Sequence, residues 1–213
     1  MSEETIEEIA PVPADHDQLI AEFSRALGDD LLSIQSNQGD VVARVRPEAW
    51  VKAAQVARDE LDLEYLSFIS VVDWMPAPIP PGTSDSDTST PTQPSEMTYG
   101  VGGGETRFQI FASLQTTMPG RPSSLIVKAD LDSEHPLIAT WSALYPGADW
   151  HEREAMDMYG VTFADHPNPR KIYLPAEFEG HPLRKDFPLL AREVKPWPGL
   201  VDVEPMPGAG ADD

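Results

Sequence analysis

The residues best suited to chemistry gather near the C-terminal end of the chain. His151, His166 and His181, with Glu154 and Asp157, supply the imidazole and carboxylate groups that metal ions and acid–base catalysts use. Their spacing matches no zinc motif, because His151-Glu-Arg-Glu154 lacks a second histidine and the other two histidines precede prolines. We therefore interpret them as turn-forming histidines and predict no metal, with a free-standing metal hydrolase as an alternative.

Basic pairs in the same region, Arg170-Lys171 and Arg184-Lys185, could in principle bind phosphate or nucleic acid. The chain carries 36 acidic and 15 basic residues, a net charge of −21, so polyanions should repel it and we expect no nucleic-acid partner. Residues 149–195 hold seven of the basic residues among nine acidic ones. That mixture suits ion pairs within the chain or across an interface.

Composition excludes several other classes of protein. The 213 residues include no cysteine, which rules out disulfides, thiolate-held zinc and the usual protein-held iron–sulfur clusters. The apolar runs are far shorter than the roughly 20 residues that span a bilayer, so we expect no direct membrane insertion. The N-terminus also has no apolar segment of the secretory type. A hydrophobic fraction of 40% is typical of a globular protein.

Hydrophobic periodicity predicts the elements that must position these residues. Helical spacing indicates helices over 15–28, 47–61 and 136–145, and strand patterns indicate strands over 31–35, 40–46, 65–72, 107–114 and 124–131. We expect the 65–72 strand to be central and the last two strands to form a hairpin. The order favours an α+β fold with a mostly antiparallel sheet, helices packed on one face and an extended proline-rich C-terminal arm. One core should contain Trp50, Phe68, Phe108, Ile110, Val127 and Trp141.

The chain divides into four parts by composition. Residues 1–14 read as a disordered acidic N-terminus, and 15–148 as the α+β domain. A Pro/Ser/Thr/Gly-rich loop insertion interrupts that domain at about 75–105. A helix and an extended docking arm follow over 149–195, and 196–213 form a flexible acidic tail.

The last predicted helix opens the arm. Asp149 and Glu152 fit a capping box at its start, and Gly160 can end it. Arg153 and Asp157 are four residues apart, so they could pair on its surface. Residues 160–199 contain seven prolines and only short strand-like stubs, so we expect this segment to be ordered only against another surface.

Several runs of this region together form a recognisable pattern. They are Trp150-His-Glu-Arg-Glu-Ala-Met-Asp-Met-Tyr-Gly160, Phe163-Ala-Asp-His-Pro167, Arg170-Lys-Ile172 and Gly180-His-Pro-Leu-Arg-Lys-Asp-Phe-Pro188. The pattern resembles the C subunit of proton-translocating NADH:quinone oxidoreductase, respiratory complex I. Similar subunits of membrane-bound hydrogenases and of ferredoxin- or F420-dependent relatives of complex I are the alternative.

The resemblance implies a cofactor-free peripheral-arm subunit of a hetero-oligomer at the cytoplasmic face of the cell membrane. FMN and the iron–sulfur clusters would lie in partner subunits, and the isolated chain would have no activity. The arm would dock onto the D and B subunits. We expect the residues that dock to act in assembly and not in chemistry: Arg153, Glu154, Asp157, His166, Arg170, His181, Leu183, Arg184, Lys185, Asp186 and Phe187.

Overall fold

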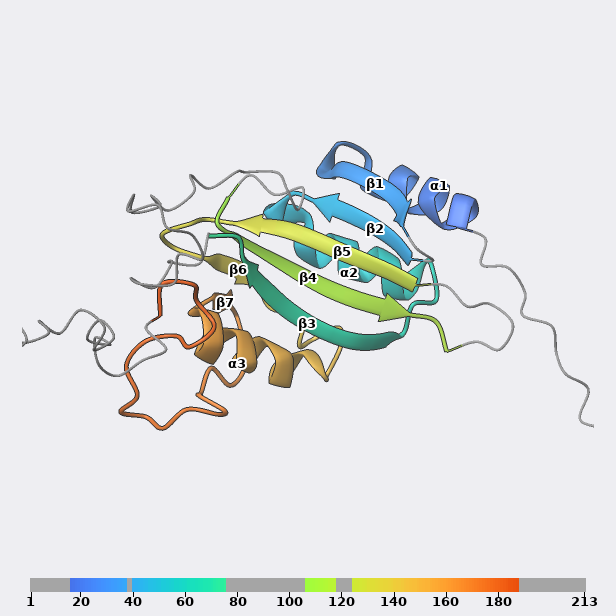
Figure 1. Cartoon of the computed structure of the whole chain (residues 1–213). Helices are drawn as coiled ribbons and strands as arrows, with labels where there is room; N and C mark the ends of the chain where they lie inside the picture. The colour runs from blue at the N-terminus through green and yellow to red at the C-terminus, as the bar shows by residue number, and fades with distance from the viewer. Residues whose placement is uncertain (1–15, 38–39, 76–105, 118–123, 188–213) are drawn as a thin grey trace, which may run out of the picture.

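The computed structural model of the protein describes residues 16–37, 40–75, 106–117 and 124–187 (Figure 1). The predictions for 1–14, for nearly all of the 75–105 insertion and for 188–213 lie outside these residues. The elements are α1 (His16–Leu27), β1 (Leu31–Asn37), β2 (Asp40–Val45), α2 (Trp50–Asp59), β3 (Tyr65–Asp73), β4 (Phe108–Gln115), β5 (Ser124–Leu131), β6 (Leu137–Ala139), α3 (Ala148–Tyr159) and β7 (Thr162–Ala164). Short 3₁₀ turns over Gly28–Asp30 and Pro47–Ala49 precede β1 and α2.

Five strands form one sheet in the order β1-β2-β5-β4-β3. Every neighbouring pair is antiparallel except β2 and β5, which run parallel, so the predicted α+β class with a mostly antiparallel sheet is confirmed. The predicted hairpin is also present as β4 and β5. The central position predicted for residues 65–72 is wrong, because β3 lies at the edge of the sheet and α3 runs beside it (Figure 1).

Alternation along β4 and β5 selects the face of the sheet that forms the core. Phe108, Ile110, Ala112 and Leu114 of β4 and Leu125, Val127, Ala129 and Leu131 of β5 are all buried. Five of the six predicted core residues are fully buried, but Phe68 is 40% exposed. A register shift between Leu66 and Phe68 explains the error, because beyond it Ile69 and Val71 occupy the inward positions.

Helices α1 and α2 pack on the core face of the sheet (Figure 1). Leu19, Phe23 and Leu27 form the buried side of α1, at helical spacing. Trp50, the first residue of α2, stacks on Trp141 with ring centroids 4.1 Å apart. The Trp141 indole Nε1–H donates to the Trp50 carbonyl over 3.1 Å, so this pair joins α2 to the segment after β6.

The predicted helix over 136–145 is wrong. Its first residues instead form β6, which pairs in parallel with β7 through Ile138 and Phe163. The Thr140 N–H continues this pairing to the Ala164 carbonyl, and the next residues form a turn ending at Pro146 and Gly147. Pairing with a strand that lies about 25 residues later has overridden the local helical spacing.

The final helix is present, but its N-terminus differs from the predicted capping box. The helix α3 begins at Ala148, its N-cap is Gly147, and no side chain caps that end. Asp149 is already helical, and the Glu152 carboxylate accepts the Trp141 N–H of the segment after β6. Gly160 ends the helix as predicted, with φ +70° and its N–H donated to the Met156 carbonyl.

Two further observations complete the description of the fold. The Trp74 N–H donates to the Arg107 carbonyl over 2.8 Å, so the two residues that flank the predicted 75–105 insertion are joined. Within the described ranges, no helix has the length and apolar character needed to cross a membrane.

Candidate functional site at α3 and the arm

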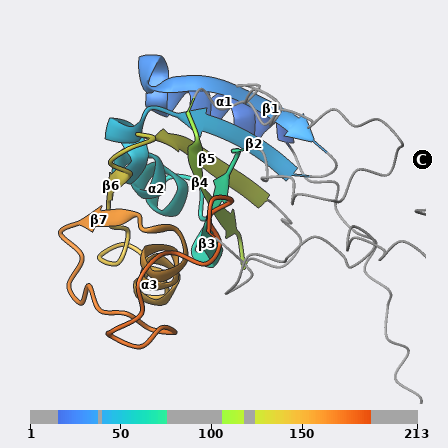
Figure 2. The ribbon, with the colours of Figure 1, turned by 60° about the vertical axis from the view of Figure 1, so that its left-hand side comes forward.

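The arm, here residues 165–187, lies against α3 and the neighbouring end of the sheet (Figure 2). Its main contact is with the C-terminal end of α3, where the last carbonyl groups of any helix lack partners in the helix itself. Three of these carbonyls accept hydrogen bonds from the arm: Asp157 from His181 Nδ1 at 2.9 Å, Met158 from the Leu183 N–H at 3.1 Å and Tyr159 from Arg184 Nε at 2.6 Å. The arm therefore caps α3.

Gly160 makes this contact possible. A Cβ on this residue would overlap with His181 Nε2 and would lie 2.7 Å from Arg184 Nη2, closer than real Cβ atoms approach other atoms. Its left-handed backbone conformation is also costly for any residue with a Cβ. Two runs of the sequence pattern, 150–160 and the described part of the second, 180–187, thus form the two sides of one contact.

A second contact joins the arm to the sheet through Asp73, whose side chain is fully buried at the end of β3. Arg107 donates to both carboxylate oxygens, from Nε at 2.9 Å and from Nη2 at 2.7 Å. The Lys185 backbone N–H donates to Asp73 Oδ2 at 2.9 Å, and Arg107 also pairs with Asp186 at 3.0 Å. Burial by itself raises the pKa of Asp73, but these donors outweigh it and hold that pKa below its usual value.

Two guanidinium groups share the ring of Phe108 in this region. Arg107 Cζ lies 4.7 Å and Arg184 Cζ 5.0 Å from its centroid. Burial, together with the nearby Arg107 charge, lowers the pKa of Arg184. Arg184 is therefore held by the Tyr159 carbonyl and the Phe108 ring of the same chain.

Asp157 organises the middle of the arm. Its Oδ2 accepts the backbone N–H groups of Ile172 at 2.7 Å, Tyr173 at 2.9 Å and Leu174 at 3.3 Å. Burial raises its pKa, but these three donors and the Lys171 charge lower it more, so the net pKa is below the usual value. The suggested ion pair between Arg153 and Asp157 is therefore wrong.

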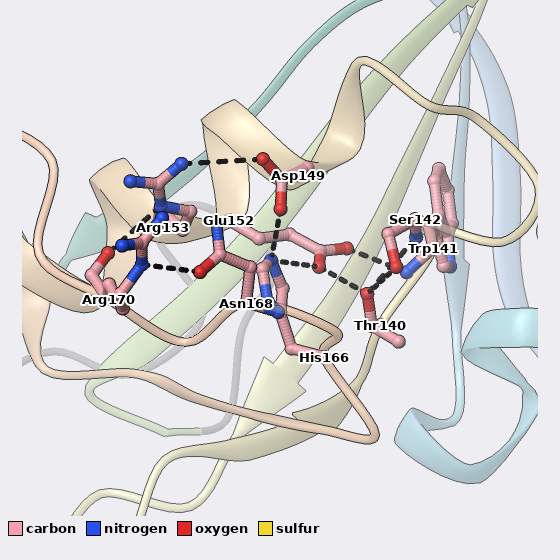
Figure 3. A network of polar contacts seen from close by, with 9 residues as sticks. All are labelled: Thr140, Trp141, Ser142, Asp149, Glu152, Arg153, His166, Asn168 and Arg170. Carbon is pink, nitrogen blue, oxygen red and sulfur yellow. Dashed lines mark hydrogen bonds and ion pairs between the residues drawn. The ribbon is translucent and has the colours of Figure 1, made fainter.

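Arg153 instead supports the first turn of the arm (Figure 3). Its Nε donates to the Arg170 carbonyl at 2.9 Å, its Nη1 lies 3.4 Å from Asp149 Oδ2, and its guanidinium lies over the Trp150 ring. Arg170 is fixed in turn by Asn168 Oδ1, which accepts from its Nε at 2.6 Å.

Glu152 forms the buried centre of the cluster in Figure 3. Its carboxylate accepts the Trp141 backbone N–H at 2.6 Å and the Thr140 hydroxyl, so it ties α3 to the segment after β6. Burial outweighs these hydrogen bonds and the nearby Asp149 charge adds to it, which raises the pKa of Glu152 to about 7.

The buried His166 faces the same carboxylate. Its Nδ1 accepts the Asn168 N–H at 3.0 Å, so the proton of the neutral ring sits on Nε2. That Nε2 lies 3.6 Å from Glu152 and 3.5 Å from Asp149, and it makes no hydrogen bond. His166 and His181 lie beside opposite ends of α3, and the described residues contain no group of three or more ligand side chains that could hold a metal ion.

Arg170 and Asp186 stay exposed despite these contacts, and four further predicted docking residues remain to be placed. Glu154 is half-buried, Phe187 stacks on Phe178 with centroids 6.0 Å apart, and the side chains of Leu183 and Lys185 are exposed. Sequence reasoning missed Asp73, Arg107 and Glu152 as members of the site. For Asp73 a signal was present, because it follows Ile69 and Val71 at the inward positions of β3.

Comparisons of sequence and of fold relate the chain to known proteins. Residues 43–193 match the family model "Respiratory-chain NADH dehydrogenase, 30 Kd subunit". The chain is 32% identical over 182 residues to the C subunit of NADH-quinone oxidoreductase from Roseiflexus castenholzii, a match that covers 84% of this chain and 88% of the relative. It is 31% identical over 209 residues to the C/D subunit of NADH-quinone oxidoreductase from Ectopseudomonas mendocina, which covers 92% of this chain and 30% of that longer protein.

The fold also resembles a solved structure, a chain of the membrane-bound sulfane sulfur reductase, an archaeal respiratory membrane complex. The TM-score is 0.59 at 15% identity, covering 83% of this chain and 87% of that one, a likeness of fold alone. The family match and the identity to the Roseiflexus protein both extend over most of the chain. The chain therefore belongs to the family of NADH-quinone oxidoreductase C subunits, the 30 kDa subunits of the respiratory-chain NADH dehydrogenase, and is a subunit of that complex.

Proposed function

We propose that this chain is a cofactor-free peripheral-arm subunit that holds neighbouring subunits of complex I in place. Electrons pass from NADH through FMN and iron–sulfur clusters of partner subunits to quinone, and this chain supports that transfer without carrying it. The chain has no cysteine to hold a cluster, and its polar residues around α3 are engaged in joining backbone segments. This arrangement suits a scaffold better than an active site.

The proposed partners are the D and B subunits. A relative that carries the letters of two subunits in its name, the C/D protein of Ectopseudomonas mendocina, supports the association with D. The contact with B follows from the resemblance in sequence pattern. We place the chain peripherally, at the cytoplasmic face of the cell membrane, as part of the membrane complex.

The observation that carries this proposal is the exposure of large apolar side chains on a segment whose backbone is already fixed. Trp150 and Tyr173 are 61% exposed and Leu183 is 49% exposed. Asp157 and the end of α3 hold the backbone of the arm beside the last two. Burying such side chains against a partner is favourable by about 25 cal/mol per Å², and a prefixed backbone loses little entropy on docking.

The predicted docking residues then divide into two groups. The first group contacts the partner directly, namely Glu154, Leu183, Lys185 and Phe187. The others set the shape of the docking surface through contacts within the chain, namely Arg153, Asp157, His166, Arg170, His181, Arg184 and Asp186. None of these side chains is assigned a role in the redox chemistry.

Competition for incorporation tests the proposal. A tagged variant and the untagged wild-type chain are expressed together, the complex is purified, and mass spectrometry gives the ratio of the two chains and identifies the D and B subunits. The double variant Tyr173→Ser/Leu183→Ser should be incorporated about tenfold less, which corresponds to about 1.4 kcal/mol of association. NADH:quinone turnover per assembled complex should stay near normal.

The chain offers a matched control. Tyr65 and Leu137 are 53% and 55% exposed but lie on β3 and β6, outside the arm, so Tyr65→Ser/Leu137→Ser should be incorporated like the wild type. Equal incorporation of both double variants would contradict docking through the arm. A purified complex without an NADH-binding flavin subunit would instead favour the hydrogenase or ferredoxin-dependent relatives.

A further inference from the structure

The ring of His166 lies between two carboxylates of α3 (Figure 3). Its side chain has no exposed surface, and its Nε2 lies 3.5 Å from Asp149 Oδ1 and 3.6 Å from Glu152 Oε2. A hydrogen bond from a nitrogen to an oxygen is roughly 2.7–3.2 Å long, so this buried nitrogen has no partner. A buried donor without a partner is costly, and a shift of about 0.6–0.7 Å toward either oxygen would give it one.

This nitrogen is a donor that faces two acceptors. The Nδ1 of His166 accepts the Asn168 N–H at 3.0 Å, so the proton of the neutral ring sits on Nε2. Asp149 is partly exposed and its other oxygen lies 3.4 Å from Arg153 Nη1, whereas Glu152 is fully buried. Two carboxyl groups in different surroundings therefore compete for one N–H.

The charge of Glu152 decides which acceptor is stronger. Burial raises the pKa of Glu152 to about 7, so this carboxyl gains or loses its proton near neutral pH. When ionised, it is a buried charge that water screens little, and it attracts the Nε2–H more strongly than Asp149, which also pairs with Arg153. When protonated, it is neutral and a weaker acceptor, so Asp149 becomes the favoured partner.

The titratable and charged side chains of this cluster come from α3 and the arm: Asp149, Glu152 and Arg153 from the helix, His166 and Arg170 from the arm. The segment after β6 faces Glu152 with a hydroxyl and a backbone N–H, which carry no charge. Guanidinium groups keep their charge throughout the neutral range. The response of the cluster to pH therefore comes from its carboxyl groups and its ring.

The ring is connected to the backbone of the first turn of the arm. Asn168, whose N–H binds Nδ1, also accepts from Arg170 Nε at 2.6 Å. The Arg170 carbonyl accepts in turn from Arg153 Nε at 2.9 Å. A ring that moves toward Asp149 also competes with Arg153 for that carboxylate. Movement of the ring is therefore transmitted to the turn through both links.

We propose that His166 is a switch that donates to Glu152 when that carboxyl is ionised and to Asp149 when it is protonated, and that each position sets a different arrangement of the first turn of the arm. As pH rises, Glu152 releases its proton to water and the Nε2–H turns toward it. As pH falls, the carboxyl takes a proton from water and the Nε2–H turns toward Asp149. The inference concerns contacts within the chain, so it goes beyond the proposed function and is tested separately from docking.

An NMR titration of the full chain from about pH 5 to about pH 9 tests the inference. The carboxyl ¹³C signal of Glu152 reports its ionisation, the ring ¹⁵N signals of His166 report the ring, and the backbone amide of Asn168 reports the turn. In the wild type, the Nε2 and Asn168 signals should follow the Glu152 signal with one shared midpoint near pH 7. The Nδ1 signal separates this movement from protonation of the ring, because Nδ1 gains a proton only in the imidazolium.

Two variants and an internal reference isolate the switch. In Glu152→Gln the side chain cannot ionise, so the shared transition of Nε2 and the Asn168 amide should be lost. Glu154→Gln, which alters a half-buried carboxylate on the same helix, should keep that transition. The ring of His181, whose Nδ1 lies 2.9 Å from the Asp157 carbonyl, should titrate identically in the wild type and in Glu152→Gln.

The inference is overturned if the Nε2 signal of His166 does not share the midpoint of Glu152 in the wild type, or if its transition survives in Glu152→Gln. A change at Nδ1 with the same midpoint would assign the transition to the charge of the ring and would overturn it as well. So would a change of the ring signals without a change at the Asn168 amide, since the switch would then not reach the arm. Should Glu152→Gln fail to fold, the shared midpoint in the wild type still decides.

Discussion

The imidazole Nδ1 of His181 lies 2.9 Å from the backbone carbonyl oxygen of Asp157, 24 residues earlier in the chain. A carbonyl oxygen can only accept, so this nitrogen carries the ring proton and completes the end of α3 from outside the helix. A histidine at this position can therefore be explained by structure alone. The side chain of the same residue holds another part of the arm, because its Oδ2 accepts the Tyr173 N–H. Asp157 therefore holds the arm at two places, through its backbone carbonyl and through its carboxylate.

Replacement of Gly160 by alanine should detach the arm. The new Cβ would overlap His181 and Arg184, and the left-handed backbone alone costs about 1–2 kcal/mol. We expect at least that loss in the free energy of unfolding of the full chain, and faster trypsin cleavage after Arg184 and Lys185. Gly147→Ala has open space around its Cβ and is the control. Equal unfolding free energies and equal trypsin cleavage rates for the two variants would contradict the capping contact.

Replacement of Asp157 by asparagine should loosen residues 172–174. An amide at this position lacks the charge that three backbone N–H groups now share, a loss of about 1–3 kcal/mol. Because the folded pKa is lowered, this stabilisation is present above the unfolded pKa and is lost as pH falls through the folded value. Hydrogen exchange of these amides at neutral pH should rise in Asp157→Asn and stay unchanged in Glu154→Gln. Unaltered protection in both would refute the role given to the carboxylate.

Replacement of Glu152 by glutamine should flatten the pH dependence of stability. The folded pKa of about 7 lies above the ordinary value of 4.5, so the contribution of this group is fully present below 4.5 and is lost as pH rises through 7. Between pH 5 and pH 8 the loss is on the order of 3 kcal/mol. Denaturant unfolding at the two pH values should show a smaller difference for Glu152→Gln than for the wild type. Asp149 and His166 face the same carboxyl and are unchanged in both proteins. An identical slope would mean that Glu152 is already ionised at pH 5.

Replacement of Trp141 by alanine should cost about 3–5 kcal/mol of unfolding free energy, because its buried ring stacks on Trp50 and fills the space between α2 and β6. The exposed Trp150 gives the comparison, and Trp150→Ala should change stability by less than about 0.5 kcal/mol. Chemical denaturation of the full chain measures both. A tolerated change at Trp141 would exclude this ring from the core.

Local patterns predicted the strands and the end of α3 well. The alternation in β4 and β5 identifies their buried faces, and Gly160 marks the helix C-terminus, because both signals depend on neighbouring residues alone. The segment after Pro136 shows where local sequence patterns fail to predict the structure. Leu137 to Tyr145 has helical spacing, but its backbone pairs with β7 and its turn is fixed by Glu152, partners that no local pattern reveals.

The site was predicted as a region rather than as a set of contacts. The runs at 150–160 and 180–188 drew attention to the right residues, yet their charged side chains suggested surface pairs. In the structure, the side chains of Asp157, His181 and Arg184 instead form hydrogen bonds to backbone groups. Every residue carries backbone groups, so no sequence pattern marks these partners. Arg107 could not be found from the sequence, because it meets Asp73 across 34 residues and Asp186 across 79.

The hydrogen bond between the Trp74 N–H and the Arg107 carbonyl has a practical consequence for protein engineering. The domain itself holds the two ends of the 75–105 insertion together, and loop-closure entropy changes by only about 0.6 kcal/mol for each doubling of length. Residues 76–104 should therefore be replaceable by a short turn, or by a fluorescent or affinity module, with little loss of assembly. Failure of a shortened chain to enter the complex would reveal a partner for the insertion. Success would make this position an internal handle for isolating the intact respiratory complex without altering either end of the protein.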